Sequence, residues 1–128
     1  MRPIQLEDLL LLAEDLLGRP AEHILRVIDI GLAESALAAP FAGFGEREFY
    51  EGVGVRAAIL ASRLIRNHPL PDGNKRLALV AMIEFIRRND AQWPTDVDQD
   101  EVADVFERLA ARDVSEPDFA AWVLSKLG

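Results

Sequence analysis

A short stretch rich in helix-breaking residues separates the two longest helical stretches of this chain. Pro69 and Pro71 cannot lie inside a helix without breaking it, because a proline ring removes a backbone donor and clashes with the preceding turn. We therefore expect a stiff loop that joins a helix over about residues 47–67 to a second helix that starts near residues 73–74. The second helix is apolar on almost every face over residues 77–86, which predicts that it is central and buried.

The rest of the chain also has the pattern of helices joined by short connections. Helical segments are expected over residues 5–17, 21–30 (weaker, or mixed), 31–40, 98–111 and from 115 onward. Polar or glycine-containing loops separate them over residues 41–46 and 89–97. No convincing strand, internal repeat or linker is present. The sequence therefore predicts one all-α domain over residues 1–128.

Composition limits the classes of function. The chain has 128 residues, of which 50% are hydrophobic, and it contains no cysteine. This length suffices for one domain with a real core, and the lack of cysteine excludes disulfides, thiolate metal sites and cysteine nucleophiles. No apolar run is long enough to cross a bilayer, and the N-terminal residues lack a signal-peptide pattern. We therefore expect a soluble, cytoplasmic protein with no membrane partner.

The chain is acidic, with a formal net charge of −8. Binding of nucleic acid depends on neutralising phosphates with cations, so no direct nucleic-acid partner is expected. Against this background Lys75 and Arg76, with Arg66 nearby, form a local basic cluster. Its simplest interpretation is a group of solvated surface charges.

The position of this basic cluster favours a second interpretation. Lys75 and Arg76 fall in the first turn of the expected helix, where the helix dipole disfavours each cation by roughly 0.3–1 kcal/mol. The same turn presents unpaired backbone N–H groups that suit an anion. Gly73 permits close approach of a ligand to the backbone. The turn formed by Gly73, Asn74, Lys75 and Arg76 is therefore predicted to bind phosphate.

Two further side chains of the loop could take part in binding or catalysis. Asp72 could cap the helix or hold Mg²⁺ together with phosphate oxygens, and the sequence leaves both roles open. His68 lies at the mouth of the same loop, where an imidazole could accept a proton from a hydroxyl nucleophile, although a lone histidine is more often structural or merely exposed. The other histidine, His23, has no polar cluster around it in the sequence and is given no role.

The segment HPLPDGNKR resembles the H-P-F-x-[DN]-G-N-x-R loop of Fic-domain proteins, and its Asn-Lys-Arg version resembles the Doc (death-on-curing) branch of this Fic/Doc, or Fido, family. The similarity covers most of residues 25–90. It implies a compact helical domain with a central helix after the loop. It also implies roles for seven residues. His68 would be the general base, Asp72 would bind Mg²⁺, and Gly73 and Asn74 would shape the anion-binding turn. Lys75 and Arg76 would bind phosphate, and Arg66 would help to bind the nucleotide or the target.

Three departures from the Fic pattern bear on the reaction. Leu70 replaces a phenylalanine that packs inward, Lys75 replaces the second glycine of G-N-G, and Leu79 replaces a second arginine. Fic enzymes that transfer AMP use that glycine and that arginine to seat ATP. The Doc branch resembles this chain at both positions and is associated with transfer of the γ-phosphate to a translation elongation factor.

The resemblance therefore implies a Doc-like toxin kinase that uses ATP and Mg²⁺ to phosphorylate a Ser/Thr hydroxyl of a translation factor of the elongation factor Tu type. The first alternative is an AMP transferase. The second is a non-catalytic interaction domain that keeps the fold and binds a partner.

Regulation by a separate protein is also expected. Self-silencing Fic enzymes carry [ST]-x-x-x-E-[GN], but the only Glu-Gly pair here is Glu51-Gly52, and Arg47 stands four residues before it. The resemblance implies a Phd-like antitoxin whose C-terminal segment folds into a groove on this domain. We also expect the loop over residues 41–48 to lie beside the site and to dock the target through its backbone. The alternative is an ordinary connector with Phe41 and Phe44 in the core.

Overall fold

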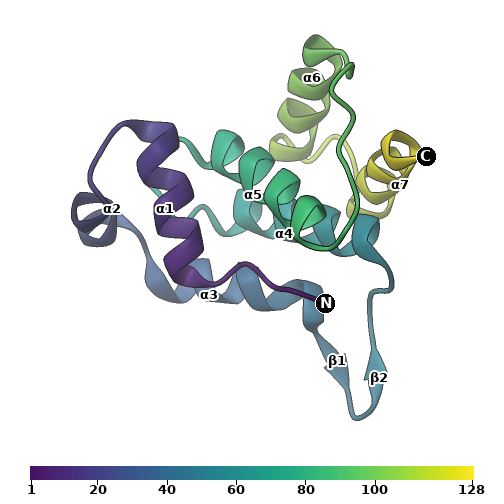
Figure 1. Cartoon of the computed structure of the whole chain (residues 1–128), viewed down its shortest axis with the longest axis horizontal. Helices are drawn as coiled ribbons and strands as arrows, with labels where there is room; N and C mark the ends of the chain where they lie inside the picture. Colours follow the sequence, from purple (N-terminus) through teal and green to yellow (C-terminus); the bar gives the residue numbers. More distant parts are fainter.

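The computed structural model describes all 128 residues and confirms an all-α fold (Figure 1). The elements in chain order are α1 (Leu6–Leu17), α2 (Ala21–Val27), α3 (Ile30–Ala38), the 3₁₀ turn η1 (Ala39–Phe41), β1 (Gly43–Phe44), β2 (Arg47–Glu48), α4 (Val53–Asn67), α5 (Asn74–Arg88), α6 (Gln99–Ala110) and α7 (Glu116–Leu127).

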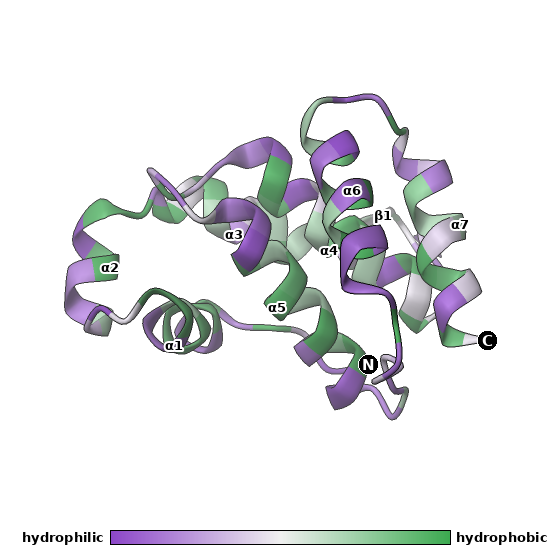
Figure 2. Ribbon diagram, turned by 90° about the horizontal axis from the view of Figure 1, so that it is seen from above, coloured by the Kyte–Doolittle hydropathy of each residue, from purple (hydrophilic) through white to green (hydrophobic).

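Helices α4 and α5 form the centre of the molecule and pack against each other. Helix α3 and helix α7 also pack on α4, while α1 packs on α5. The prediction of a buried helix after the loop is confirmed, because Leu77, Met82 and Phe85 of α5 are fully buried. Figure 2 shows α5 as a mostly hydrophobic helix in the middle and α6 as largely hydrophilic on its outer side. None of the helices has both the length and the apolar character needed to cross a membrane.

The segment before α4 differs from the expectation. The helix predicted over residues 47–67 begins only at Val53, and a small antiparallel hairpin formed by β1 and β2 precedes it. Gly45 and Gly52 both have positive φ angles, of 63° and 83°, which place a turn between the strands and a break before the helix. The prediction that no strand is present is therefore wrong at this point.

Side-chain caps explain where two further helices, α3 and α7, begin. The segment predicted over residues 21–30 is interrupted at Ile28 and Asp29, because the Asp29 side chain accepts a hydrogen bond from Leu32 N–H and starts α3. At the other end of the chain, Ser115 caps α7 by accepting a hydrogen bond from Asp118 N–H at 3.2 Å. The predicted start of the final helix is confirmed.

Candidate active site

The loop between α4 and α5 is held from both ends. His68 ends α4 in the left-handed conformation, with φ 53° and ψ 56°, and its N–H donates to Leu64 C=O. A non-glycine residue in this region is uncommon, and such strain is found where the surrounding structure determines the backbone. Next, the C=O of Pro69 accepts a hydrogen bond of 2.8 Å from Asp29 N–H, which ties the loop to the start of α3.

Asn74 fixes the loop from inside. Its side-chain Oδ1 accepts from Leu70 N–H at 3.0 Å, and its Nδ2 donates to Leu70 C=O at 2.9 Å. Asn74 is 6% exposed and Leu70 is 2% exposed, so the position where the Fic pattern has phenylalanine does pack inward. These two hydrogen bonds hold the Asn74 side chain against the backbone of Leu70, so Asn74 shapes the turn, while its backbone N–H has no acceptor in the protein.

The start of α5 is electropositive and open. Gly73 occupies the N-cap position with φ 88°, and no side chain caps the helix. The backbone N–H groups of Asn74, Lys75 and Arg76 have no acceptor in the structure. Asp72 therefore does not cap α5. An uncapped first turn of this kind is an anion-binding arrangement.

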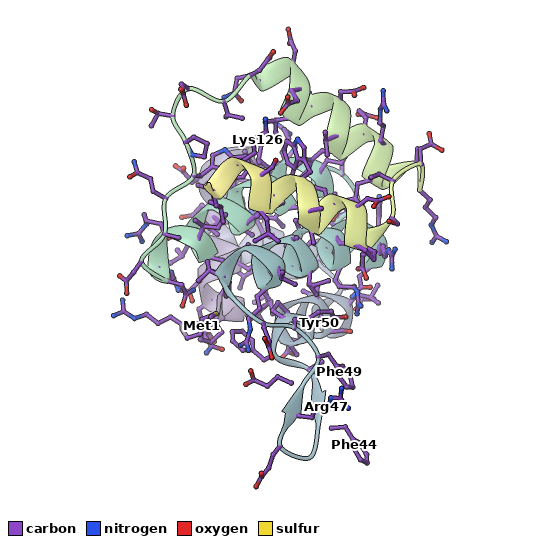
Figure 3. The ribbon with its side chains drawn as sticks, turned by 90° about the vertical axis from the view of Figure 1, so that its right-hand side faces the viewer. Met1, Phe44, Arg47, Phe49, Tyr50 and Lys126 are labelled. Carbon is purple, nitrogen blue, oxygen red and sulfur yellow. The ribbon has the colours of Figure 1, made fainter.

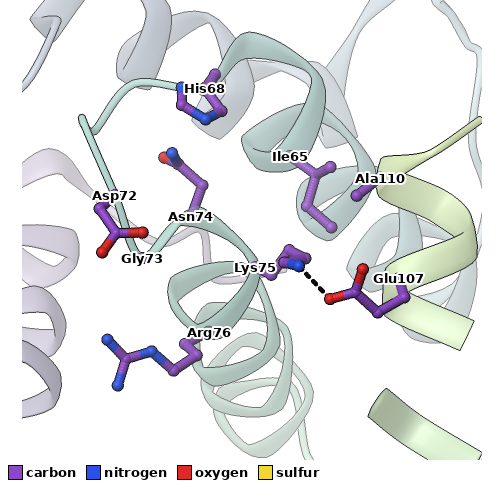
Figure 4. Close-up of a pocket in the computed structure, with 9 residues that line it drawn as sticks. All are labelled: Ile65, His68, Asp72, Gly73, Asn74, Lys75, Arg76, Glu107 and Ala110. Carbon is purple, nitrogen blue, oxygen red and sulfur yellow. Dashed lines mark hydrogen bonds and ion pairs between the residues drawn. The ribbon is translucent and has the colours of Figure 1, made fainter. Parts of the chain in front are cut away.

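A cavity of about 590 Å³ opens onto this turn (Figure 4). It brings together six of the seven predicted site residues. The full lining consists of Ile65, His68, Asp72, Gly73, Asn74, Lys75, Arg76, Glu107 and Ala110. The arrangement places an exposed imidazole, an exposed carboxylate and two exposed cations around the open helix start.

Asp72 is suited to bind a metal ion together with the phosphate oxygens of a ligand. Its side chain is exposed and makes no hydrogen bond or ion pair with the protein. The chain contains no group of three or more His, Asp or Glu side chains arranged to hold a metal on their own. A single free carboxylate beside an anion site fits Mg²⁺ that takes its other ligands from phosphate oxygens and water.

Arg66, the seventh predicted residue, is not part of the cavity. Its guanidinium lies 3.5 Å from Oε2 of Glu116, at the start of α7. The same carboxylate accepts hydrogen bonds from Arg63 and Ser62. Burial raises the pKa of Glu116, but the hydrogen bonds from Arg63 and Ser62 and the charges of Arg63 and Arg66 lower it further, so the net pKa lies below the ordinary value. In this structure Arg66 helps to hold α7 against α4.

Sequence reasoning missed the wall of the cavity that α6 supplies. Glu107 forms an ion pair with Lys75, which Figure 4 marks with a dashed line. The pair is largely exposed, so its stabilising free energy is small, but it places a carboxylate against a cation predicted to bind phosphate. The periodic pattern of α6 identifies only its core residues Val102, Phe106 and Leu109. No local signal connects Glu107 to Lys75, which lies 32 residues earlier in the chain.

The hairpin lies away from this cavity. It precedes the first residue of α4, whereas His68 follows the last, and a helix of 15 residues is about 22 Å long. Figure 3 shows the hairpin projecting from the helices. Phe44, at its tip, is 83% exposed. The prediction that residues 41–48 lie beside the site is therefore wrong. The alternative was an ordinary connector with Phe41 and Phe44 in the core. It holds only for Phe41, whose ring packs against Phe85 at a centroid distance of 6.1 Å.

Two comparisons with known proteins include this loop. A family model described as the Fic/DOC family matches residues 3–86. A protein of Mycolicibacterium smegmatis named Toxin Doc is 38% identical over 97 residues, which cover 76% of this chain and 75% of that protein. The family match runs from α1 to near the end of α5, and so it includes the turn and the cavity residues of α4 and α5.

Proposed function

The chain belongs to the Fic/DOC family, in its Doc branch, and on this premise we propose that it is a toxin that transfers the terminal phosphoryl group of ATP to a serine or threonine hydroxyl of a protein. The substrate proposed is a translation elongation factor of the Tu type. The observation that carries the proposal is the convergence of His68, Asp72 and the open start of α5 on one cavity.

Each residue contributes a separate part of this reaction. His68 accepts the proton of the attacking hydroxyl. The free N–H groups of the turn and the side chain of Arg76 bind the phosphates, and Lys75 joins them once it leaves Glu107. Mg²⁺ bound to Asp72 and to phosphate oxygens would neutralise charge on the transferred group. Transfer of this kind depends on positioning and charge, both of which the fixed loop supports.

Position 79 favours phosphoryl transfer over AMP transfer. Leu79 packs against the hydrophobic core from the second turn of α5 and offers no charge to a phosphate. The side chain of Lys75 also lines the cavity where AMP-transferring relatives have glycine. Transfer of AMP is therefore the second candidate reaction, and a non-catalytic interaction domain is the third candidate function.

The test uses ATP labelled at either the γ or the α phosphate, incubated with the protein, Mg²⁺ and a bacterial lysate. We expect the γ label alone to appear on a protein of the size of elongation factor Tu. The variant His68→Ala should transfer no label and should keep the circular dichroism spectrum of the wild type, because His68 is exposed. Transfer of the α label would establish the second reaction. Absence of any label with folded protein would support the interaction domain.

We also propose an antitoxin partner of the Phd type. A free toxin of this activity should slow bacterial growth when expressed alone, and the His68→Ala variant should relieve the effect. Co-expression with a Phd-like protein should restore growth to cells that make the wild type. Normal growth with abundant, folded wild-type protein alone would contradict the toxin proposal.

A further inference from the structure

A second cavity, also of about 590 Å³, adjoins the first on its α1–α2 side. Its lining comes from the end of α1, the α1–α2 connection, α2, the loop before α5 and the first turn of α5: Leu17, Arg19, His23, Ile24, Arg26, Val27, Leu70, Pro71, Asp72 and Arg76. Asp72 and Arg76 line both cavities. A Cβ atom on Gly73 would lie 3.0 Å from Leu17 Cδ2, so the absence of a side chain there lets α1 approach the turn.

The second cavity gathers free cations. Six arginines of the chain make no ion pair, and three of these, Arg19, Arg26 and Arg76, line this cavity. His23 lies among them, and Asp72 is the only acidic residue of the lining. Such a concentration of unpaired guanidinium groups in a chain of net charge −8 indicates an anionic ligand.

Apolar side chains form the rest of this wall. Leu17, Ile24, Val27 and Leu70 line the second cavity, whereas only Ile65 and Ala110 are apolar in the first. A concave site with apolar walls and a few charged groups is typical of small-molecule sites. Planar guanidinium groups can also stack on an aromatic ring. This chemistry suits a nucleoside with its phosphates, because the apolar side chains can receive the base while the arginines face the phosphates and the sugar.

The direction of phosphoryl transfer separates the roles of the two cavities. The acceptor oxygen forms its bond to the γ-phosphorus while the bond from that phosphorus to the bridging oxygen of ADP breaks, and the two oxygens lie roughly in line. The proton of the acceptor passes to His68, and ADP leaves with the electron pair. His68 lines only the first cavity. The leaving nucleotide must therefore extend away from it.

Asp72 and Arg76 connect the two cavities, because both residues line both of them. Figure 4 shows both side chains on the same side of the start of α5, with Lys75 and Glu107 on the other. We propose that the second cavity is the nucleoside subsite: the base lies on the wall of Leu17, Ile24 and Val27, and Arg19 and Arg26 stack on the base and donate to the ribose hydroxyls, while Arg76 holds the phosphates. This inference rests on the proposed function, since it assumes that ATP is the donor.

The test measures binding of two probes by calorimetry in the presence of Mg²⁺: ATP and inorganic tripolyphosphate. Tripolyphosphate carries the three phosphates that this proposal assigns to the start of α5, Asp72 and Arg76, and it lacks the base and ribose assigned to Arg19 and Arg26. We expect Arg19→Gln/Arg26→Gln to weaken ATP binding at least tenfold and tripolyphosphate binding less than threefold. The matched control is Arg47→Gln/Arg112→Gln, which removes the same charge from two exposed, unpaired arginines outside both cavities and should change neither.

Other results would overturn the inference in distinguishable ways. ATP binding by Arg19→Gln/Arg26→Gln that equals the control would refute the subsite while leaving the proposed function intact. Equal weakening of ATP and tripolyphosphate would assign the cavity to phosphates alone. Unchanged ATP binding with a raised KM for the protein substrate would assign it to an acidic peptide. If the folded wild type binds no ATP, both the subsite and the kinase proposal fail.

Discussion

At the scale of single residues, Asn74 fixes the geometry of the site through its two hydrogen bonds with the backbone of Leu70. We expect Asn74→Ala to lower the free energy of unfolding by about 1–3 kcal/mol, because a buried N–H and C=O lose their partner. The matched control is Asn67→Ala, which removes only the exposed hydrogen bond to Leu32 C=O and should cost less than about 1 kcal/mol. Urea unfolding measures both values. Equal losses would show that Asn74 has no special part in holding the loop.

Glu107 gives a second prediction at this scale. Its carboxylate competes with phosphate for Lys75, so Glu107→Gln should tighten binding of Mg·ATP several-fold. Asp104→Asn is the control, because it removes the same charge from the same helix at a residue that pairs with Arg108 outside the cavity. Calorimetric titration compares the two variants. Equal tightening by both would mean that only the net charge of the molecule matters, and weaker binding by Glu107→Gln would mean that Glu107 assists the ligand.

At the scale of elements, the attachment of α7 to α4 depends on the Glu116 carboxylate. Its folded-state pKa lies below the ordinary value of 4.5, so the unfolded chain binds more protons at mildly acidic pH. The stabilisation is complete above pH 4.5 and is lost as the pH falls from there through the lower folded-state value. We expect Glu116→Gln to be less stable than the wild type at neutral pH by about 1–3 kcal/mol, since Arg63 loses a charged hydrogen-bond partner.

The difference between these two proteins should narrow as the solution is acidified below pH 4.5, because both then carry an uncharged side chain at position 116. Urea unfolding at a series of pH values measures it. A stability difference that stays constant through the acidic range would show that the carboxylate charge contributes nothing to the attachment of α7.

The elements also show what a sequence can reveal. The cap at Ser115, the break at Pro69 and Pro71 and the apolar faces of the helices are local signals, and they predict most of the fold. The cap at Asp29 is also local, but the prediction over residues 21–30 did not use it and continued through it. The hairpin escaped prediction because its strands have two residues each, too short for an alternating pattern. When the hairpin is not recognised, the apolar pattern of the following residues predicts a helix that begins as early as residue 47.

At the scale of the whole molecule, the two cavities are built from parts of the chain that are distant in sequence. The loop before α5 supplies the local motif, and it could be predicted because its residues are adjacent. Glu107, Arg19 and His23 come from α6, from the α1–α2 connection and from α2, and only tertiary packing brings them to the loop. The same packing turns Arg66 toward Glu116 and away from the cavity that the sequence predicted for it.

The measurement that tests the central claim most directly is the intact mass of purified elongation factor Tu after incubation with this protein, ATP and Mg²⁺. We expect the elongation factor to gain the mass of one phosphoryl group and ADP to appear in equal amount, with neither change when His68→Ala replaces the wild type. A gain of the mass of AMP with release of pyrophosphate would contradict the account, and so would a phosphoryl gain that the His68→Ala variant produces at the wild-type rate.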